Sequence, residues 1–365
     1  MLPYVSTASV ARDMDLIRRA LGERQITYVG FSYGTLLGAT YASLFPDSYR
    51  AMVLDGPVDA DAYINDPLRH LSAQSTGYED ALDRFLQACE ADQGACRGFG
   101  ATDPAGAYDD LLERLDAAPV ATTDGRTVDA DDVRAGTLLT LNNKGSWPFL
   151  AQALVDLNGG NGDRMRRATD LFYQRNGDGS YQPFNDRYFA ITAAEQQYPR
   201  DLGAYLRAGE RSFESHEHFW WNNGYLELTY GLYRERSRDV YSGPFPVRRS
   251  APAPLVVATT HDPATPYRGA RNLVRDLENA RLLTMQGDGH TAYPGNSTCI
   301  NAAVEAYINE TTLPPIGTQC QQEVGFAAPR SPTAADKAAA IGAAPGAPCG
   351  ACRIVAPPGG WGTRR

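Results

Sequence analysis

The sequence predicts an α/β protein whose mostly parallel sheet is interrupted by a mainly helical insertion. Two stretches of the chain, residues 1–60 and 246–326, alternate short apolar runs with segments of helical periodicity. The stretch between them, residues 61–245, is dominated by helical patterns and is dense in aromatic residues near its end. We therefore expect one α/β core, divided in sequence into two parts, with a helical cap inserted between them.

The first part of the predicted core reads as helix, strand, helix, strand. A segment with apolar residues at helical spacing precedes Gly22, and the β-branched and aromatic run 26–29 predicts a strand. A helix over residues 35–45 ends before a proline, and the apolar run 51–56 is the next strand. Strands that alternate with helices are joined by crossovers, which predicts parallel pairing.

The cap and the second part of the core follow the same logic. The clearest helical patterns of the cap cover residues 78–91 and 107–118. The second part of the core alternates strands and helices over residues 254–260, 269–277, 280–285 and 301–308. The last stretch, 327–365, takes 24 of its 39 residues from Ala, Gly and Pro, so it cannot bury a core and is predicted to be disordered.

Composition excludes some classes of function. The net charge of -9 argues against a nucleic-acid partner, because such binding needs a basic surface. No apolar run reaches the ~18 residues of a membrane-spanning helix. The sequence shows no convincing zinc pattern, so we expect no metal and no cofactor, and no protein partner is evident.

The six cysteines bear on the compartment of the protein. Cys89 with Cys96 and Cys299 with Cys320 would suit local disulfides, which would mean an oxidising compartment. The alternative is buried or free thiols. The two remaining cysteines form a CxxC inside the Ala/Gly/Pro-rich stretch, which weakens a redox or metal role. The N-terminus lacks the basic and apolar regions of a secretory signal.

A candidate nucleophile lies between the first strand and the second helix. Residues 30–34, Gly-Phe-Ser-Tyr-Gly, fit the pattern G-x-S-x-G. A serine hydroxyl is a weak nucleophile that must be presented to a base, and a tight strand-to-helix turn does this. The pattern alone could be a plain Gly-rich turn, but its place between a strand and a helix favours Ser32 as the nucleophile.

Two later loops supply a candidate acid and base. Asp262 follows a buried strand and could orient an imidazole, although capping its own turn is an alternative, and Asp55 and Asp59 are rival acids. Of the five histidines, only His290 lies in a Gly-flanked loop after a late strand, whereas His261 adjoins the acid. The chain order Ser, Asp, His is the order of α/β-hydrolases, so we predict an α/β-hydrolase fold.

Two longer blocks of the sequence resemble a known family. The blocks YVSTASVARDMDLIRRALGERQITYVGFSYGTLLGATYASLFPDSYRAMVLDGPVD and LVVATTHDPATPYRGARNL…GDGHTAYPGNSTCI…LPPIGTQC resemble the tripeptidyl-aminopeptidase-like secreted bacterial α/β-hydrolases. The resemblance implies a catalytic triad, two disulfides, and an exported or envelope-attached enzyme that releases short peptides from free N-termini. The residues that it assigns to the triad are Ser32, Asp262 and His290, and those of the disulfides are Cys89, Cys96, Cys299 and Cys320.

The chain departs from the family pattern at three places. Family members carry further strands and a Gly-rich oxyanion loop before the region where this chain begins, so we expect a truncated gene product that lacks the N-terminal strands of the fold. One oxyanion donor would be the N–H of Tyr33, and the other would come from the absent loop. The family pattern A-I-x-C-x-D has Ala193 in place of its cysteine, and the Ala/Pro-rich end is foreign to the pattern.

The predicted chemistry is acyl transfer through a covalent serine intermediate, with an exopeptidase as the first hypothesis. An aminopeptidase needs a cap carboxylate for the substrate ammonium, and an apolar subsite could be lined by Trp220 and Trp221. The alternatives are a carboxylesterase of small esters and an inactive remnant. A metal site at residues 216–218, His-Glu-His, is disfavoured because no further ligand is near. The carboxylate candidates are Glu195, Glu214, Glu217 and Glu227.

Overall fold

The computed structural model describes residues 2–220 and 227–326. Its main sheet has five strands in the order β1-β2-β5-β6-β7, and every neighbouring pair is parallel. This confirms the predicted α/β class with a mostly parallel sheet. The predicted disordered end, residues 327–365, and Trp221 lie outside the described residues. The strands are Ile26–Phe31 (β1), Tyr49–Asp55 (β2), Leu255–His261 (β5), Arg281–Asp288 (β6) and Gln319–Gln321 (β7).

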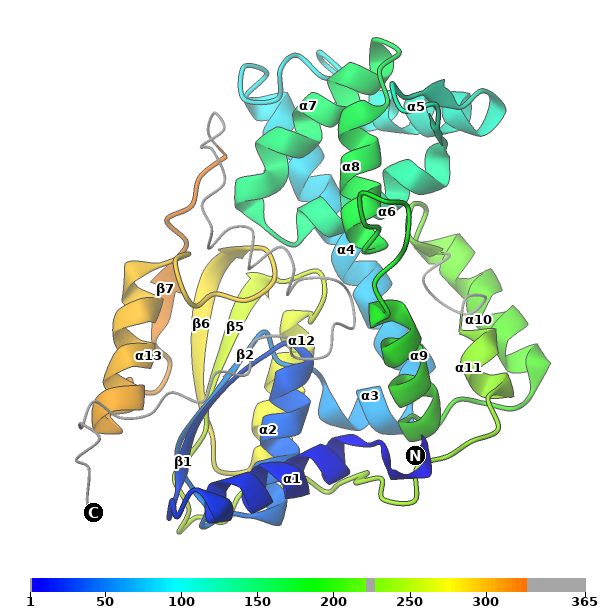
Figure 1. Ribbon diagram of the computed structural model, residues 1–365. Helices are drawn as coiled ribbons and strands as arrows, with labels where there is room; N and C mark the ends of the chain where they lie inside the picture. Colours follow the sequence, from blue (N-terminus) through cyan, green and yellow to red (C-terminus); the bar gives the residue numbers. More distant parts are fainter. Residues whose placement is uncertain (1, 221–226, 327–365) are drawn as a thin grey trace.

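Helices cover both faces of this sheet (Figure 1). On one face, α1 (Thr7–Ala20), α2 (Tyr33–Leu44) and α12 (Tyr267–Leu277) pack in a core that includes Met52 and Leu54. On the other face, α13 (Thr298–Glu310) packs in a core that includes Ala51 and Val53. Alternate residues of β2 thus enter opposite cores, as the period-two geometry of a strand requires. Because both faces of the strand are buried, its central residues 51–54 form a continuous apolar run.

Between β2 and β5 the chain forms the cap. The long helix α4 (Pro67–Ala91) leaves the sheet and enters a bundle with α5 to α8, which has an apolar core of its own (Figure 1). A short two-stranded sheet, β3-β4, belongs to the cap. The other cap elements are α3 (Ala60–Asn65), α5 (Pro104–Ala117), β3 (Val120–Ala121), β4 (Thr127–Val128), α6 (Ala130–Leu141), η2 (Lys144–Ser146), α7 (Trp147–Asn158), α8 (Asp163–Phe172), α9 (Phe184–Glu195), α10 (Leu202–Ser215) and α11 (Leu228–Leu232), and η1 (Leu2–Tyr4) opens the chain.

Side chains at the helix starts explain several boundaries. Ser6 precedes α1 and accepts a hydrogen bond from the N–H of Ser9, as a cap residue should. Asp66 and Asp103 cap α4 and α5, and each is followed by a proline in the first turn, where no N–H is needed. Helix α4 begins eleven residues before the predicted segment 78–91. Its first part contains weak helix formers, and packing of its buried residues stabilises the helix there.

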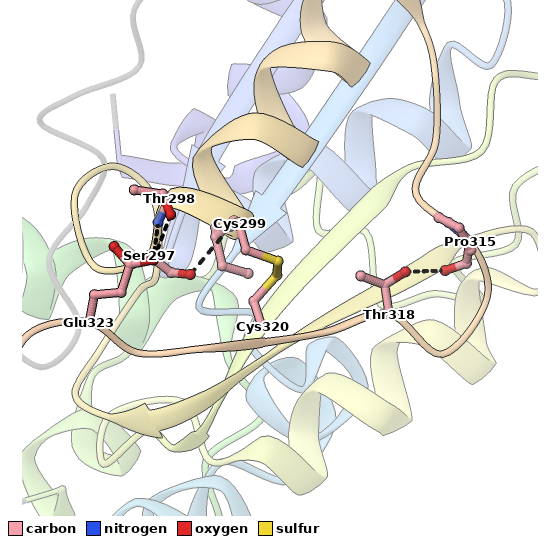
Figure 2. The surroundings of a disulfide bond; sticks show 8 residues. Ser297, Thr298, Cys299, Pro315, Thr318, Cys320 and Glu323 are labelled. Carbon is pink, nitrogen blue, oxygen red and sulfur yellow. Dashed lines mark hydrogen bonds between the residues drawn. A yellow bond between two sulfur atoms is a disulfide. The ribbon is translucent and has the colours of Figure 1, made fainter.

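Two disulfides join the predicted cysteine pairs, Cys89 with Cys96 and Cys299 with Cys320. The first links the end of α4 to the turn after it. The second links the first turn of α13 to β7, where the carboxylate of Glu323 also accepts hydrogen bonds from Thr298 (Figure 2). Within the described residues, none of the helices combines the length and the apolar character needed to cross a bilayer.

Candidate active site

Ser32 lies on the sharp turn between β1 and α2. Its φ of 53° and ψ of -122° are a conformation that non-glycine residues seldom adopt, so the turn carries backbone strain. A side chain at Gly30 would come within 2.4 Å of the carbonyl oxygen of Gly34. The glycine is therefore required by close packing, and the turn presents Ser32 at the carboxyl edge of the sheet.

Asp262 and His290 meet at the same edge. Asp262 follows β5, His290 follows β6, and the imidazole Nδ1 lies 3.0 Å from both carboxylate oxygens. The two side chains are 1% and 2% exposed. The carboxylate also accepts hydrogen bonds from the N–H of Ala264 (3.0 Å) and from the N–H (2.8 Å) and hydroxyl (2.9 Å) of Thr265. Asp262 thus both caps its own turn and holds the imidazole.

The electrostatics suit a general base. Burial alone would lower the pKa of His290, but the negative charges of Asp262 and Asp55 outweigh burial, and the pKa lies above its ordinary value. Because Nδ1 faces Asp262, Nε2 is the nitrogen left for a serine. The hydrogen bonds of the described residues do not include one between Ser32 and His290, and such bonds often tighten only when substrate binds.

The end of β2 and the loop after it contact both the serine and the histidine. The N–H of Ser32 donates to the carbonyl oxygen of Asp55 (2.9 Å). The next residue, Gly56, has a φ of +63°, and a side chain there would come within 2.9 Å of the imidazole of His290. Ser32 and His290 are therefore held against the same two residues of β2 and its loop.

The rival residues have other partners. The carboxylate of Asp55 accepts N–H groups of the residues after His290, and Asp59 caps α3. His261 faces Asp80 at 2.8 Å. The two histidines of the disfavoured metal motif also diverge: His216 contacts Thr76, whereas both ring nitrogens of His218 face carboxylates, those of Glu79 and Asp109.

Tyr33 opens α2, where the first N–H groups of a helix have no partner within the helix. That position suits the predicted oxyanion donor. The side chain of Tyr33 points into a buried cluster in which the hydroxyl of Thr7 lies 2.5 Å from the Tyr33 hydroxyl and 2.7 Å from the carboxylate of Glu195. The N–H of Thr7 donates to the same carboxylate. We call Thr7, Tyr33 and Glu195 the Glu195 cluster.

The Glu195 cluster changes the expectation for substrate binding. Glu195 is buried, and both of its oxygens accept hydrogen bonds from Thr7, so its carboxylate is already engaged. It also lines an open cavity of about 450 Å³ beside Arg200 and Arg236, whose positive charges would repel an ammonium.

The other predicted substrate residues differ in their burial. Glu227 is buried, whereas Glu214 and Glu217 are exposed. The ring of Trp220 packs against Phe213 on α10.

The cap also holds the loop that carries His290. The carboxylate of Asp288, two residues earlier, accepts hydrogen bonds from Arg84 on α4 and from Lys144 (2.5 Å). We call Asp288, Arg84 and Lys144 the Asp288 cluster. The N–H of His290 itself donates to the carbonyl oxygen of Asn142 (2.7 Å). No local sequence pattern indicates these partners, because they lie 144 and 204 residues from Asp288 in the chain.

Comparison with known proteins places this geometry in a family context. Residues 237–320 match the family model of TAP-like proteins. The chain is 32% identical over 327 residues to Serine protease Hip1 of Mycobacterium tuberculosis (strain ATCC 25618 / H37Rv), covering 87% of this chain and 62% of that protein. It is 33% identical over 331 residues to Carboxylesterase B of the same strain, covering 87% and 61%.

A third relative is more distant. Tripeptidyl aminopeptidase of Streptomyces lividans is 28% identical over 316 residues, covering 84% of this chain and 57% of that protein. The chain thus spans less than two thirds of the length of the curated relatives that it matches. The family model and the names of these relatives agree with the family resemblance found in the sequence.

Proposed function

We propose that this chain, a TAP-like α/β-hydrolase by sequence and fold, is a serine hydrolase that releases short peptides from free N-termini. The observation that carries the proposal is the buried pair of Asp262 and His290, which lies at the sheet edge beside the strained turn of Ser32. This is the arrangement of acid, base and nucleophile that acyl transfer requires.

The proposed reaction has two steps. His290 removes the proton of the Ser32 hydroxyl, the serine oxygen attacks the substrate carbonyl, and the proton passes to the leaving amine as the acyl–nitrogen bond breaks. Water then attacks the acyl-enzyme with His290 as base, which frees Ser32 and the carboxylate product. Asp262 fixes the tautomer of His290 and stabilises its charged form. The N–H of Tyr33 supplies one hydrogen bond to the tetrahedral oxyanion.

The names of the relatives and the two disulfides bear on the substrate class and the location. Two relatives carry the names of a serine protease and a tripeptidyl aminopeptidase, which favours peptides. The relative named Carboxylesterase B favours small esters as the second candidate. The two disulfides favour an oxidising compartment, so we propose export or attachment to the cell envelope, as the family resemblance implies.

Fluorophosphonate labelling tests the proposal. We expect the chain to be labelled at Ser32 and the variant Ser32→Ala to be unlabelled, because the probe forms its covalent bond with the serine oxygen that alanine lacks. Soluble, folded protein that is not labelled would overturn the proposal and favour an inactive remnant.

Three substrates then separate the two candidate functions. These are an N-terminally free tripeptide anilide, its N-blocked form and a short acyl ester. Preference for the free anilide supports the aminopeptidase, whereas equal hydrolysis of the blocked anilide, or of the ester alone, supports an esterase-like enzyme.

A further inference from the structure

Asp55 is a buried carboxylate that the proposed triad does not use. It is the last residue of β2, the strand that lies between β1 and β5, and it is 0% exposed. A carboxylate in this position is costly unless its oxygens accept hydrogen bonds. Its location, between the strand that presents Ser32 and the strand that carries Asp262, calls for an explanation.

The hydrogen bonds of Asp55 reach both loops of the candidate site. Its carboxylate accepts the N–H of Ala292 (3.0 Å, to both oxygens) and the N–H of Tyr293 (2.8 Å). These residues follow His290 across a turn in which Thr291 has a φ of 67°, an unfavourable backbone conformation. The carbonyl oxygen of Asp55 accepts the N–H of Ser32. One residue thus fixes the turn after the base and the turn of the nucleophile.

The charges around Asp55 couple it to the base. Within the described residues, no lysine or arginine pairs with it. The titratable groups that act on it are His290, from the loop after β6, and Asp262, from the loop after β5. Asp288, two residues before the base, is held by cations of the cap instead.

The ionisation of Asp55 responds to these surroundings. Burial raises the pKa of Asp55 to about 7, although its two N–H donors and His290 oppose that rise. Its negative charge in turn is one of the causes that raise the pKa of His290. The two groups therefore titrate as neighbours that influence each other.

We propose that Asp55 is a positioning residue of the proposed acyl transfer, whose buried carboxylate fixes the turn after His290 to the strand end that also holds Ser32. The inference rests on the proposed function for its chemistry, and on the hydrogen bonds of Asp55 for its geometry. Its negative charge also favours the imidazolium that forms when His290 takes the serine proton.

The test uses the variant Asp55→Asn, which keeps the shape but loses the charge and one acceptor. Asp59→Asn is the matched control, because Asp59 lies on the same loop, caps α3 and bonds Asn272 outside the site. The readouts are the pH profile of fluorophosphonate labelling and the NMR titration of the His290 ring proton. The variant His290→Gln assigns that signal among the five histidines.

We expect Asp55→Asn to shift the titration of His290, and with it the acid limb of the labelling profile, by roughly one pH unit to lower pH, because a negative charge is lost. Labelling at pH 8 should fall about tenfold, because the base is less well positioned. Asp59→Asn should change neither. A folded Asp55→Asn protein with both curves unchanged would overturn the proposal. If that variant does not fold, the wild-type titration decides: a His290 signal with a second inflection from Asp55 supports the proposal, and a single step overturns it.

The experiment separates this proposal from the proposed function. The NMR titration reports on Asp55 and His290 whether or not the chain turns over a substrate. A wild-type chain that is not labelled, but whose His290 signal responds to Asp55→Asn, would contradict the serine-hydrolase proposal while supporting the role of Asp55 in placing His290.

Discussion

The cap contacts the candidate site at two buried carboxylates, Asp288 near His290 and Glu195 near Ser32, and the two differ in their partners. Beside His290, the buried carboxylate of Asp288 receives two cationic side chains from the cap. Beside Ser32, the hydrogen bonds that the buried carboxylate of Glu195 accepts within the described residues come from the N–H and the hydroxyl of Thr7. Burial penalises both negative charges, but within the described residues only Asp288 forms direct ion pairs with cationic side chains.

The pKa values of the two carboxylates move in opposite directions as a result. Burial alone would raise the pKa of Asp288, but Arg84 and Lys144 outweigh it and the pKa lies below its ordinary value. Burial raises the pKa of Glu195, and hydrogen bonds from Thr7 offset it only in part. Asp288 therefore belongs to an ion-pair network that keeps its charge in acid, whereas Glu195 takes up a proton more readily.

The largest expected effect comes from breaking the Asp288 cluster. Asp288→Ala removes the carboxylate that pairs with both Arg84 and Lys144, and the two cations are only partly exposed. We expect the free energy of unfolding to fall by about 2–4 kcal/mol, because removal of one member strands the other charges. Denaturant unfolding measures this loss, and fluorophosphonate labelling should fall with it because the His290 loop is released.

The control for that experiment is an exposed ion pair. Asp47 and Arg248 are 2.7 Å apart, with side chains that are 83% and 56% exposed. Asp47→Ala should change the free energy of unfolding by less than about 0.5 kcal/mol, because water screens such pairs. Equal losses of unfolding free energy in Asp288→Ala and Asp47→Ala would mean that the Asp288 cluster does not stabilise the contact between the cap and the core.

The Glu195 cluster should respond to smaller changes. Because the Thr7 hydroxyl donates to Glu195, the hydroxyl of Tyr33 must donate to Thr7, which makes a directed chain of hydrogen bonds. In Glu195→Gln, an NH₂ group replaces one of the two carboxylate oxygens that accept hydrogen bonds from Thr7. We expect this to lower the free energy of unfolding by about 1–3 kcal/mol. Tyr33→Phe removes only the outer hydroxyl and should cost about 1 kcal/mol.

A double-mutant cycle tests whether these residues act as one unit. The variant with both Glu195→Gln and Tyr33→Phe should lose less free energy of unfolding than the sum of the two single losses, because the residues share Thr7. Labelling of Ser32 should decline in both single variants, since Tyr33 is its neighbour in the turn. Strict additivity would show that the chain of hydrogen bonds is not coupled.

Sequence alone could predict the parts of this molecule that are local. The strand, turn and helix around Ser32 are contiguous, and Asp262 and His290 each follow a strand directly, so pattern and chain order were enough to choose them. The structure brings Asp262 and His290 into contact, as that prediction requires. The α/β class followed from the alternation of strands and helices and is confirmed.

The Glu195 cluster and the Asp288 cluster could not be predicted in the same way. Glu195 lies 188 residues from Thr7 in the chain. The sequence suggested Glu195 as a substrate ligand because an aminopeptidase needs a cap carboxylate for the substrate ammonium. Its burial depends on the fold, which brings the end of α9 to Thr7 at the start of α1. The same holds for Asp288, whose partners come from two separate cap elements, α4 and η2. Long-range ion pairs of this kind leave no periodic signal in a sequence.

The smallest expected effect is a difference in pH dependence between the two carboxylates. The pKa of Glu195 is raised on folding, so the stability that depends on its proton is present in acid and lost as pH rises toward the raised value. The pKa of Asp288 is lowered, so its contribution is present above the ordinary value of about 3.9 and is lost only as pH falls below it. Glu195→Gln should therefore cost more stability at pH 5 than at pH 8, whereas Asp288→Asn should cost the same at both. Denaturant unfolding of the two variants and the wild type at these two pH values measures the difference, and parallel pH dependences would mean that the two carboxylates are held by the same kind of contact.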